Sequence, residues 1–329
     1  MSTAQAAPDL ASLDLSFERP VRRGLAHKAA VEQVLVTDFA RIADDEFACA
    51  CHLPRAHRFF NDGSRGHYDP LLLLEAGRQA VVLGIHEVMD VPRENEFVFV
   101  QLELEVVDVA ALAIGREPAQ LVGYSRAQNR RYVSGEPVGV EVVGDLFVDG
   151  TRCVTIVGSG AFMGERMYKL VRRRAKPEPD PAWVPAEPAP AALVGRSDPA
   201  NVVISPPEPR ADAPGAFATE VVVDQGHATF FDHPLDHVPG MLLVEALRQT
   251  ALASACEVHG LDPAAAILTG CTAKYGRYGE LGSPIGCEAT VGDVSEPATG
   301  DHPRVAVELG MSQFGRSIAD ARLTLDFLG

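Results

Sequence analysis

The chain has 329 residues, of which 47% are hydrophobic and 22% are charged, and its formal net charge is −16. This composition is typical of a soluble globular protein, and the length is enough for two domains that each bury a core. The negative charge argues against general nucleic-acid binding, because a phosphate backbone would repel most of the surface.

We expect no targeting signal in the N-terminal region, because its first sixteen residues lack a basic start followed by an apolar core. No apolar run in the sequence approaches the roughly 20 residues that cross a bilayer. We therefore expect a cytoplasmic protein that does not bind membranes, with a flexible N-terminus over residues 1–20. The six cysteines show no Cys-x-x-Cys pair and no metal-ligand spacing with histidine, so we expect buried free thiols and neither a metal nor a cofactor.

One motif occurs twice. Residues 72–80 (LLLEAGRQA) recur as residues 242–250 (LLVEALRQT), and a His and a Phe-Phe pair precede both copies. This similarity predicts a tandem duplication. Residues 177–214 hold 11 of the 24 prolines, which can neither continue a helix nor donate ladder hydrogen bonds, so we expect a linker there. The predicted domains are then residues 21–176 and 215–329.

In chain order, the first half is expected to contain a helix through the apolar stretch 71–85, which must be buried because it is apolar all round. Alternation of polar and apolar residues then predicts strands at 101–106, 120–128, 138–148 and 151–162, with a tight turn at 148–151. The second half repeats this order, with a strand at 218–224, the helix around 242–250, and strands at 268–278, 287–294, 305–314 and 317–327.

This pattern predicts an α+β fold, because the simplest way to bury one long apolar helix is to wrap an antiparallel sheet around it. Two such domains side by side would form a pseudo-dimer with one continuous sheet.

Each predicted helix carries three polar side chains within one sector, since a helix advances by about 100° per residue. They are Glu75, Arg78 and Gln79 in the first helix and Glu245, Arg248 and Gln249 in the second. A buried Glu three residues from an Arg is most often a structural ion pair, and this is the alternative to a catalytic role at each helix.

Residues 230–241 (FFDHPLDHVPGM), just before the second helix, resemble the active-site region of β-hydroxyacyl-ACP dehydratases, whose fold is the hot-dog fold. Those enzymes have a His-x-Pro loop, a Pro-Gly pair that opens the central helix, and a Glu one turn further on. His233 and Glu245 match that pair, and His237 is an alternative match for the histidine. Gly240 permits close approach of a ligand, and free backbone N–H groups at this helix start can hold an oxyanion.

The Arg in both E-A-x-R-Q motifs departs from the dehydratases, which have a small residue there. The two motifs, together with residues 54–60 (PRAHRFF) and 69–72 (DPLL), resemble the A-factor biosynthesis (AfsA-type) family over most of the chain. The resemblance implies two tandem hot-dog domains and an acyltransferase. The enzyme would join a β-ketoacyl group, carried as an acyl-carrier-protein thioester, to the hydroxyl of dihydroxyacetone phosphate. Ring closure would give a butenolide phosphate, a precursor of γ-butyrolactone signals.

Under this interpretation, Glu245 assisted by His233 accepts the hydroxyl proton, and the backbone of residues 239–241 stabilises the oxyanion. Glu75 is a further catalytic candidate with a weaker case, because no Pro-Gly pair opens its helix. An Arg on either helix could bind the substrate phosphate. The candidate substrate-binding residues are Arg248, Arg78, Gln249, Gln79, Gly240, Met241, His57 and His237.

Two alternatives share the predicted fold. One is an acyl-thioester dehydratase or thioesterase, supported by His233 and Glu245, and the other is a non-catalytic scaffold that binds an acyl molecule.

A carrier protein would be acidic and should seek a basic run such as residues 172–176, although such runs are more often plain solvated surface. We expect either a monomeric pseudo-dimer or a homodimer.

Overall fold

The computed structural model describes residues 9–63, 66–175, 177–178, 181–295 and 302–328. Of the N-terminal segment that we expected to be flexible, residues 1–8 lie outside these ranges. Within these ranges, no helix combines the length and the apolar character that crossing a bilayer requires.

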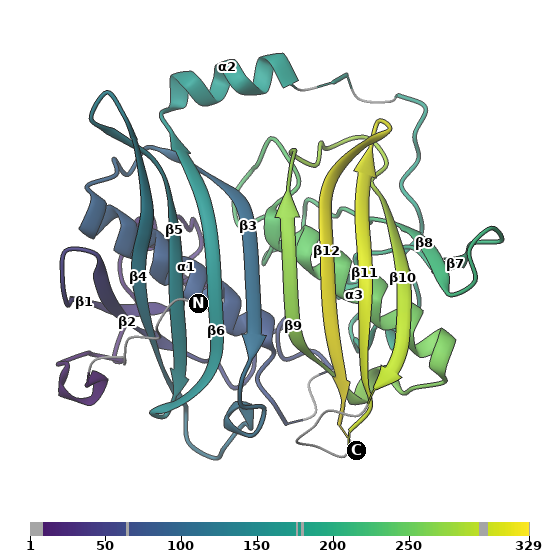
Figure 1. Ribbon diagram of the computed structural model, residues 1–329, viewed down its shortest axis with the longest axis horizontal. Helices are drawn as coiled ribbons and strands as arrows, with labels where there is room; N and C mark the ends of the chain where they lie inside the picture. Colours follow the sequence, from purple (N-terminus) through teal and green to yellow (C-terminus); the bar gives the residue numbers. More distant parts are fainter. Residues whose placement is uncertain (1–8, 64–65, 176, 179–180, 296–301, 329) are drawn as a thin grey trace.

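The two halves of the chain repeat one order of elements (Figure 1). The first half contains β1 (Val36–Arg41), β2 (Glu46–His52), α1 (Pro70–Met89), β3 (Glu96–Val106), β4 (Gln120–Val133), β5 (Glu136–Val148) and β6 (Thr151–Met163). The second half contains β7 (Glu208–Pro209), β8 (Ala216–Glu220), α3 (Gly240–His259), β9 (Ala266–Tyr275), β10 (Gly286–Ser295), β11 (Arg304–Gln313) and β12 (Arg316–Phe327). A further helix, α2 (Glu165–Ala175), follows β6.

The strands of the described residues form one twelve-stranded antiparallel sheet, in the order β1-β2-β4-β5-β6-β3-β9-β12-β11-β10-β8-β7. The halves meet where β3 pairs with β9, from Gln101 opposite Lys274 to Glu105 opposite Gly270. Strand order runs the same way outward from this junction in both halves, so a pseudo-twofold axis passes between β3 and β9. The predicted α+β fold with a continuous sheet and a pseudo-dimer is confirmed.

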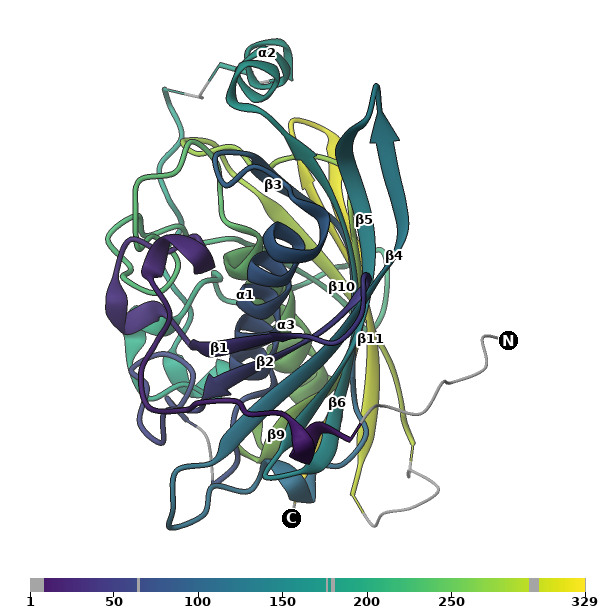
Figure 2. The ribbon, with the colours of Figure 1, turned by 90° about the vertical axis from the view of Figure 1, so that its left-hand side faces the viewer.

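Both central helices lie on the same face of the sheet, and loops cover their other side (Figure 2). Leu71 to Leu74 in α1 and Leu242 to Val244 in α3 are buried. The helices are therefore enclosed between the sheet and the loops, which explains why they are apolar all round.

Two strands and one α-helix of the first half were not anticipated from the sequence. In β2 the run Ala48 to Cys51 is small, apolar and buried on both sides, so it lacks the alternation that marks a strand with one solvated face. Its partner β1 is short and mixed in polarity, and α2 is highly charged. The proline-rich segment 177–214 is partly buried: Val194 and Ile204 are inaccessible to solvent, and it brings Arg196 into the interior.

The close packing of α1 on β2 generates a stability prediction. A Cβ atom added at Gly84 would lie 2.2 Å from the ring of Phe47, which is itself fully buried and cannot move away. We expect Gly84→Ala to lower the free energy of unfolding by about 1–3 kcal/mol, despite the better helix propensity of Ala. Chemical denaturation measures this.

The matched control is Gly77→Ala in the same helix, where the nearest atom to an added Cβ is the flexible end of Ile156, at 3.0 Å. This variant should lose clearly less stability than Gly84→Ala. Equal stability of the two variants would contradict the packing described here.

Candidate active site

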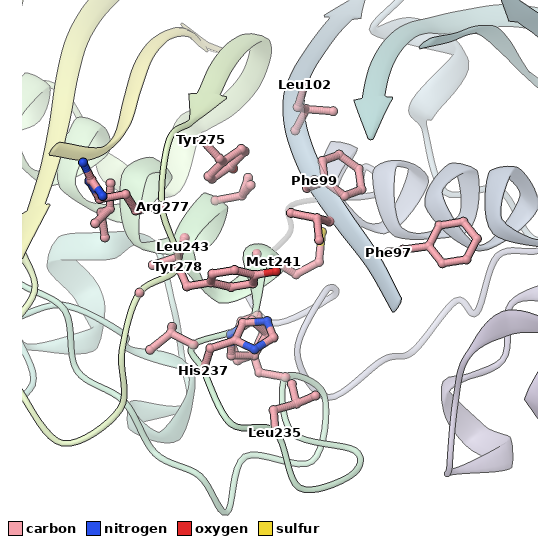
Figure 3. Close-up of a pocket in the computed structure, with 18 of the residues that line it drawn as sticks. Phe97, Phe99, Leu102, Leu235, His237, Met241, Leu243, Tyr275, Arg277 and Tyr278 are labelled. Carbon is pink, nitrogen blue, oxygen red and sulfur yellow. The ribbon is translucent and has the colours of Figure 1, made fainter. Parts of the chain in front are cut away.

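A cavity of about 860 Å³ is lined by residues of both halves (Figure 3). It lies where β3 and β9 diverge beyond their pairing at Gln101 and Lys274, at the end of the sheet where α2 lies. Much of its wall is apolar or aromatic, and these residues include Leu74, Phe97, Phe99, Leu102, Met241, Leu243, Val244, Tyr275 and Tyr278. A cavity of this size and lining suits an acyl chain.

The polar wall of this cavity is built around Glu75 of α1. Its carboxylate accepts two hydrogen bonds from Arg78, both 2.8 Å, and one from Gln79, and the Nζ atom of Lys28 lies 3.0 Å away. Burial raises the pKa of Glu75, but the charges of Arg78 and Lys28 outweigh this and hold it well below its ordinary value. Glu75 is thus an ionised carboxylate that holds two cations at the cavity.

A histidine from the other half completes the polar wall. His233 lines the cavity, and its Nδ1 lies 2.7 Å from Asp232. Asp232 also accepts the backbone N–H of Ala29, and although burial raises its pKa, this bond and the charge of Lys28 lower it on balance. Because Asp232 is ionised, Nδ1 of His233 donates to it and Nε2 is left as an acceptor, the arrangement of an oriented general base.

The N-terminus of α3 also reaches the cavity, at Gly240 and Met241. The N-cap residue is Pro239, which makes no side-chain capping bond. Its carbonyl oxygen accepts from Leu242 and Leu243, deeper in the first turn. The N–H groups at the start of α3 are therefore available to an oxyanion.

The helix α2 docks at the mouth of the cavity. Arg172 is 4% exposed and forms a bidentate ion pair with Glu280, both contacts 2.7 Å, and a further bond to Asp236. Asp236 in turn lies 2.7 Å from Nδ1 of His237, which lines the cavity. Arg172, part of the basic run at 172–176, is thus a structural anchor. Side chains 174–176 lie outside the described residues.

The second helix carries the same cluster around Glu245, which is fully buried. Glu245 accepts from Arg248 at 2.8 and 2.7 Å, from Gln249 at 2.5 Å and from Arg196 at 2.9 Å. Burial raises its pKa, but Arg196 and Arg248 outweigh this and lower it to about 2. Arg248 lines a cavity of only about 60 Å³. We call the cluster around Glu75 the open site and the cluster around Glu245 the closed site.

Matching positions explain the difference between the two sites. The repeat aligns residues 24–36 with 192–204 and residues 57–80 with 227–250. Three side chains of the open site are thereby replaced: His27, Lys28 and His233 correspond to Gly195, Arg196 and Gly63. A Cβ atom at Gly63 would lie 1.9 Å from the carbonyl oxygen of Gly195. The backbone thus fills the space that two histidines border in the open site.

The arginine from the proline-rich segment completes the closure. Nη1 of Arg196 donates to the carbonyl oxygens of Phe59, at 2.6 Å, and Asp62, at 3.0 Å, while Nη2 reaches Glu245. Its guanidinium also lies 4.3 Å from the centre of the Phe59 ring. Arg196 therefore joins the aromatic loop of the first half to the helix of the second.

Of the residues predicted from the sequence, Glu75, Arg78, His233, His237, Gly240 and Met241 all line the large cavity. Glu245 does not line it. Gln79 and Gln249 hydrogen-bond the backbone of the upstream segments. Gln79 accepts from Leu35 N–H and donates to the carbonyl of Gln33, and Gln249 makes the equivalent bonds to Val203 and Asn201.

His57 accepts hydrogen bonds from the backbone N–H groups of Phe59 and Phe60, at 3.1 and 3.2 Å, and so shapes the aromatic loop.

Lys28, Arg196 and Asp232 were not predicted from the sequence. The first two could have been found by extending the repeat upstream, where GLAHKAAVEQVLV aligns with ALVGRSDPANVVI and places a cation in both copies.

Comparison with known proteins yields one family. The family model described as the A-factor biosynthesis hotdog domain matches residues 11–163 and again residues 178–329. A 2-oxo-3-(phosphooxy)propyl 3-oxoalkanoate synthase of Streptomyces griseus is 31% identical over 91% of this chain and 93% of its own length. A synthase of the same name from Streptomyces virginiae is 32% identical, over 82% and 86%. Among solved structures, a 12:0-ACP thioesterase from Umbellularia californica gives a TM-score of 0.46 at 14% identity, covering 84% of this chain and 93% of that one.

The closed site generates a stability prediction. Replacing Glu245 by Gln removes the carboxylate to which two buried guanidinium groups donate, so we expect Glu245→Gln to lower the free energy of unfolding by about 3–5 kcal/mol at neutral pH. Because the folded-state pKa of about 2 lies below the ordinary 4.5, the carboxylate stabilises the protein above pH 4.5, and this is lost as pH falls toward 2. The variant should therefore lose less stability than the wild type over that interval.

Denaturant unfolding at pH 7 and at pH 3 measures both effects. Glu308→Gln removes an exposed carboxylate paired with Arg322 and should change stability by no more than about 0.5 kcal/mol. If Glu245→Gln were equally mild, the closed site would not have the structural role assigned to it.

Proposed function

The chain belongs to the A-factor biosynthesis hotdog-domain family, and we propose that it transfers a β-ketoacyl group from a carrier-protein thioester to dihydroxyacetone phosphate. The relatives' name describes an ester between a 3-oxoalkanoic acid and a phosphorylated three-carbon ketone, which is the product of such a transfer. Relatives covering most of the chain support this proposal.

The observation that carries the proposal is the composition of the large cavity. Apolar residues of α1, β3 and α3 suit an acyl chain, while one wall presents two cations, Lys28 and Arg78, beside the His233–Asp232 pair. Their positive charge suits a phosphorylated acceptor, which hydrolysis or dehydration of an acyl thioester does not need. The open site is therefore the proposed active site.

The reaction follows from these positions. Nε2 of His233 removes the acceptor's hydroxyl proton as that oxygen adds to the thioester carbonyl carbon. The carbonyl oxygen becomes an oxyanion and accepts the N–H of Met241 at the start of α3. When the carbonyl re-forms, the carbon–sulfur bond breaks and His233 returns the proton to the departing thiolate, leaving the ester and the free carrier thiol.

The glutamates have a different role from the one that the sequence suggested. Glu75 is ionised and already accepts from Arg78 and Gln79, and these contacts lower its pKa and make it a weak base. We therefore assign it the positioning of Lys28 and Arg78. The fully buried Glu245 holds the closed site together. In this proposal the proton passes through His233 instead of either glutamate.

The mouth of the cavity offers a docking surface for the carrier. Arg277 and Arg316 line the cavity and are exposed. Neither guanidinium has an ion-pair partner among the residues that the structure describes. Close to them, Phe99 and Phe314 are 39% and 46% exposed. An acidic carrier that inserts its thioester arm here would meet positive charge and apolar surface together.

The histidine provides the direct test of the reaction. His233→Asn should lower the turnover number for ester formation by about 100-fold or more, because the general base is lost. The assay incubates a β-ketoacyl thioester with dihydroxyacetone phosphate and identifies the ester by mass. The half-buried His259, the last residue of α3, gives the control His259→Asn, which should be fully active.

Full transfer by His233→Asn would refute the mechanism. Acceptor-independent hydrolysis or loss of water by the wild type would instead favour a thioesterase or dehydratase, and tight acyl binding without turnover would favour a scaffold.

The docking surface has its own test. We expect the double variant Arg277→Glu, Arg316→Glu to raise KM for the carrier-bound substrate by about tenfold or more, through slower association, and to leave KM for a short pantetheine thioester unchanged. Arg116→Glu, in the exposed loop between the C-terminal end of β3 and β4, is the control for charge, because Arg116 does not line the cavity. An equal effect on both substrates would place the arginines in acyl binding instead of carrier docking.

A further inference from the structure

The closed site contains an internal anion. Asp69, the N-cap of α1, is 8% exposed, and its Oδ1 accepts the N–H of Leu71 at 2.9 Å. Its Oδ2 lies 3.9 Å from Nη2 of Arg196 and 4.0 Å from Nη1 of Arg248. A carboxylate of the chain itself thus lies between a helix N-terminus and two guanidinium groups.

The open site has the same frame without that carboxylate. The repeat places Pro239 at the position of Asp69 and Met241 at that of Leu71. The backbone at the two N-caps is closely similar, with φ −63° and ψ 126° at Asp69 and φ −62° and ψ 143° at Pro239. Proline has no side-chain acceptor, so the position of the Asp69 oxygens is left open to the cavity.

The two cations are present in both sites. Arg78 donates to Glu75 through Nε and Nη2, as Arg248 donates to Glu245. The remaining Nη1 of Arg78 therefore corresponds to the Nη1 of Arg248, which faces Asp69 in the closed site. Lys28 takes the place of Arg196. The side chains of Lys28 and Arg78 are 9% and 21% exposed, and both line the large cavity.

Charge counting gives the same result. In the closed site, Arg196 and Arg248 are balanced by Glu245 and Asp69. In the open site, Lys28 and Arg78 both pair with Glu75, and Pro239 provides no counterpart of Asp69. Asp62 and Asp232 occupy matching positions beside the two clusters, so they do not change the comparison. The open site therefore has one negative charge fewer than its counterpart.

We infer that Met241 N–H, Nη1 of Arg78 and Nζ of Lys28 form a subsite for anionic oxygens, in which a ligand takes the place that Asp69 takes in the closed site. The ligand class is a phosphate or a carboxylate-like group. The identity of the natural ligand rests on the proposed function. If that function holds, the anionic oxygens are those of the acceptor's phosphate and of the acyl carbon.

The decisive variant is Pro239→Asp, which installs the missing carboxylate. Asp is a favoured N-cap, so α3 should remain folded. By titration calorimetry, the wild type should bind one equivalent of octanoate, of inorganic phosphate or of both, and Pro239→Asp should weaken that binding by about tenfold or more. Pro239→Ala, which adds neither a charge nor a side-chain acceptor at the N-cap, should bind within about threefold of wild type. Lys28→Met should also weaken binding.

The outcomes separate cleanly. Binding of octanoate alone assigns the subsite to the acyl group, and binding of phosphate alone assigns it to the acceptor. Failure of the wild type to bind either probe, or undiminished binding by Pro239→Asp, overturns the inference. Because neither probe reacts, the binding result is independent of turnover. If the wild type forms the ester but Pro239→Asp does not weaken probe binding, the proposed function stands and the subsite is refuted. If the wild type binds a probe and Pro239→Asp weakens that binding, but no ester forms, the subsite stands and the proposed function is refuted.

Discussion

An ionised carboxylate on each central helix, enclosed by the protein, is the constraint on which the rest of the structure depends. Burying a charge is costly unless cations and hydrogen-bond donors surround it. Glu75 and Glu245 each accept hydrogen bonds from an Arg and a Gln of the next helical turn, and each pairs with a cation from a segment about 50 residues upstream. The same Gln bonds the backbone of that upstream segment. Each cluster therefore fixes a helix, a loop and a sheet edge relative to one another.

Duplication within one chain allows the two clusters to differ, which a symmetric homodimer cannot do. The differences are few and local. Where the open site has His27 and His233, the closed site has Gly195 and Gly63, and the two backbones approach closely enough to exclude any side chain at Gly63. Arg196 then links the aromatic loop of the first half to the helix of the second. The closed site is thus filled by backbone at the position where the open site borders a cavity.

Sequence patterns predicted the elements whose periodicity is local. The repeated E-A-x-R-Q motif, the apolar stretch 71–85 and the alternating strands identified the fold and the pseudo-dimer. β2 was missed because a strand buried on both faces has no alternation. α2 was missed because the partners of its side chains, which include Asp236, His237 and Glu280, lie far away in sequence. Which glutamate borders the cavity depends on contacts between the halves. The loop before α3 precedes Glu245 in sequence, yet Asp232 in that loop bonds Ala29 of the first half and His233 shares the cavity with Glu75.

In the proposed mechanism, that crossing of the halves also decides which group accepts the proton. A carboxylate that accepts from an Arg and a Gln and lies beside a further cation is stabilised in its charged form, and the same contacts that lower its pKa remove its basicity. His233 has the opposite arrangement: Asp232 fixes its Nδ1, and its Nε2 is left to the cavity. In the proposed mechanism the two residues have different tasks: Glu75 holds the cations in place, and His233 moves the proton. Each of these roles needs a side chain from a different half, so the open site is complete only when both domains are folded against each other.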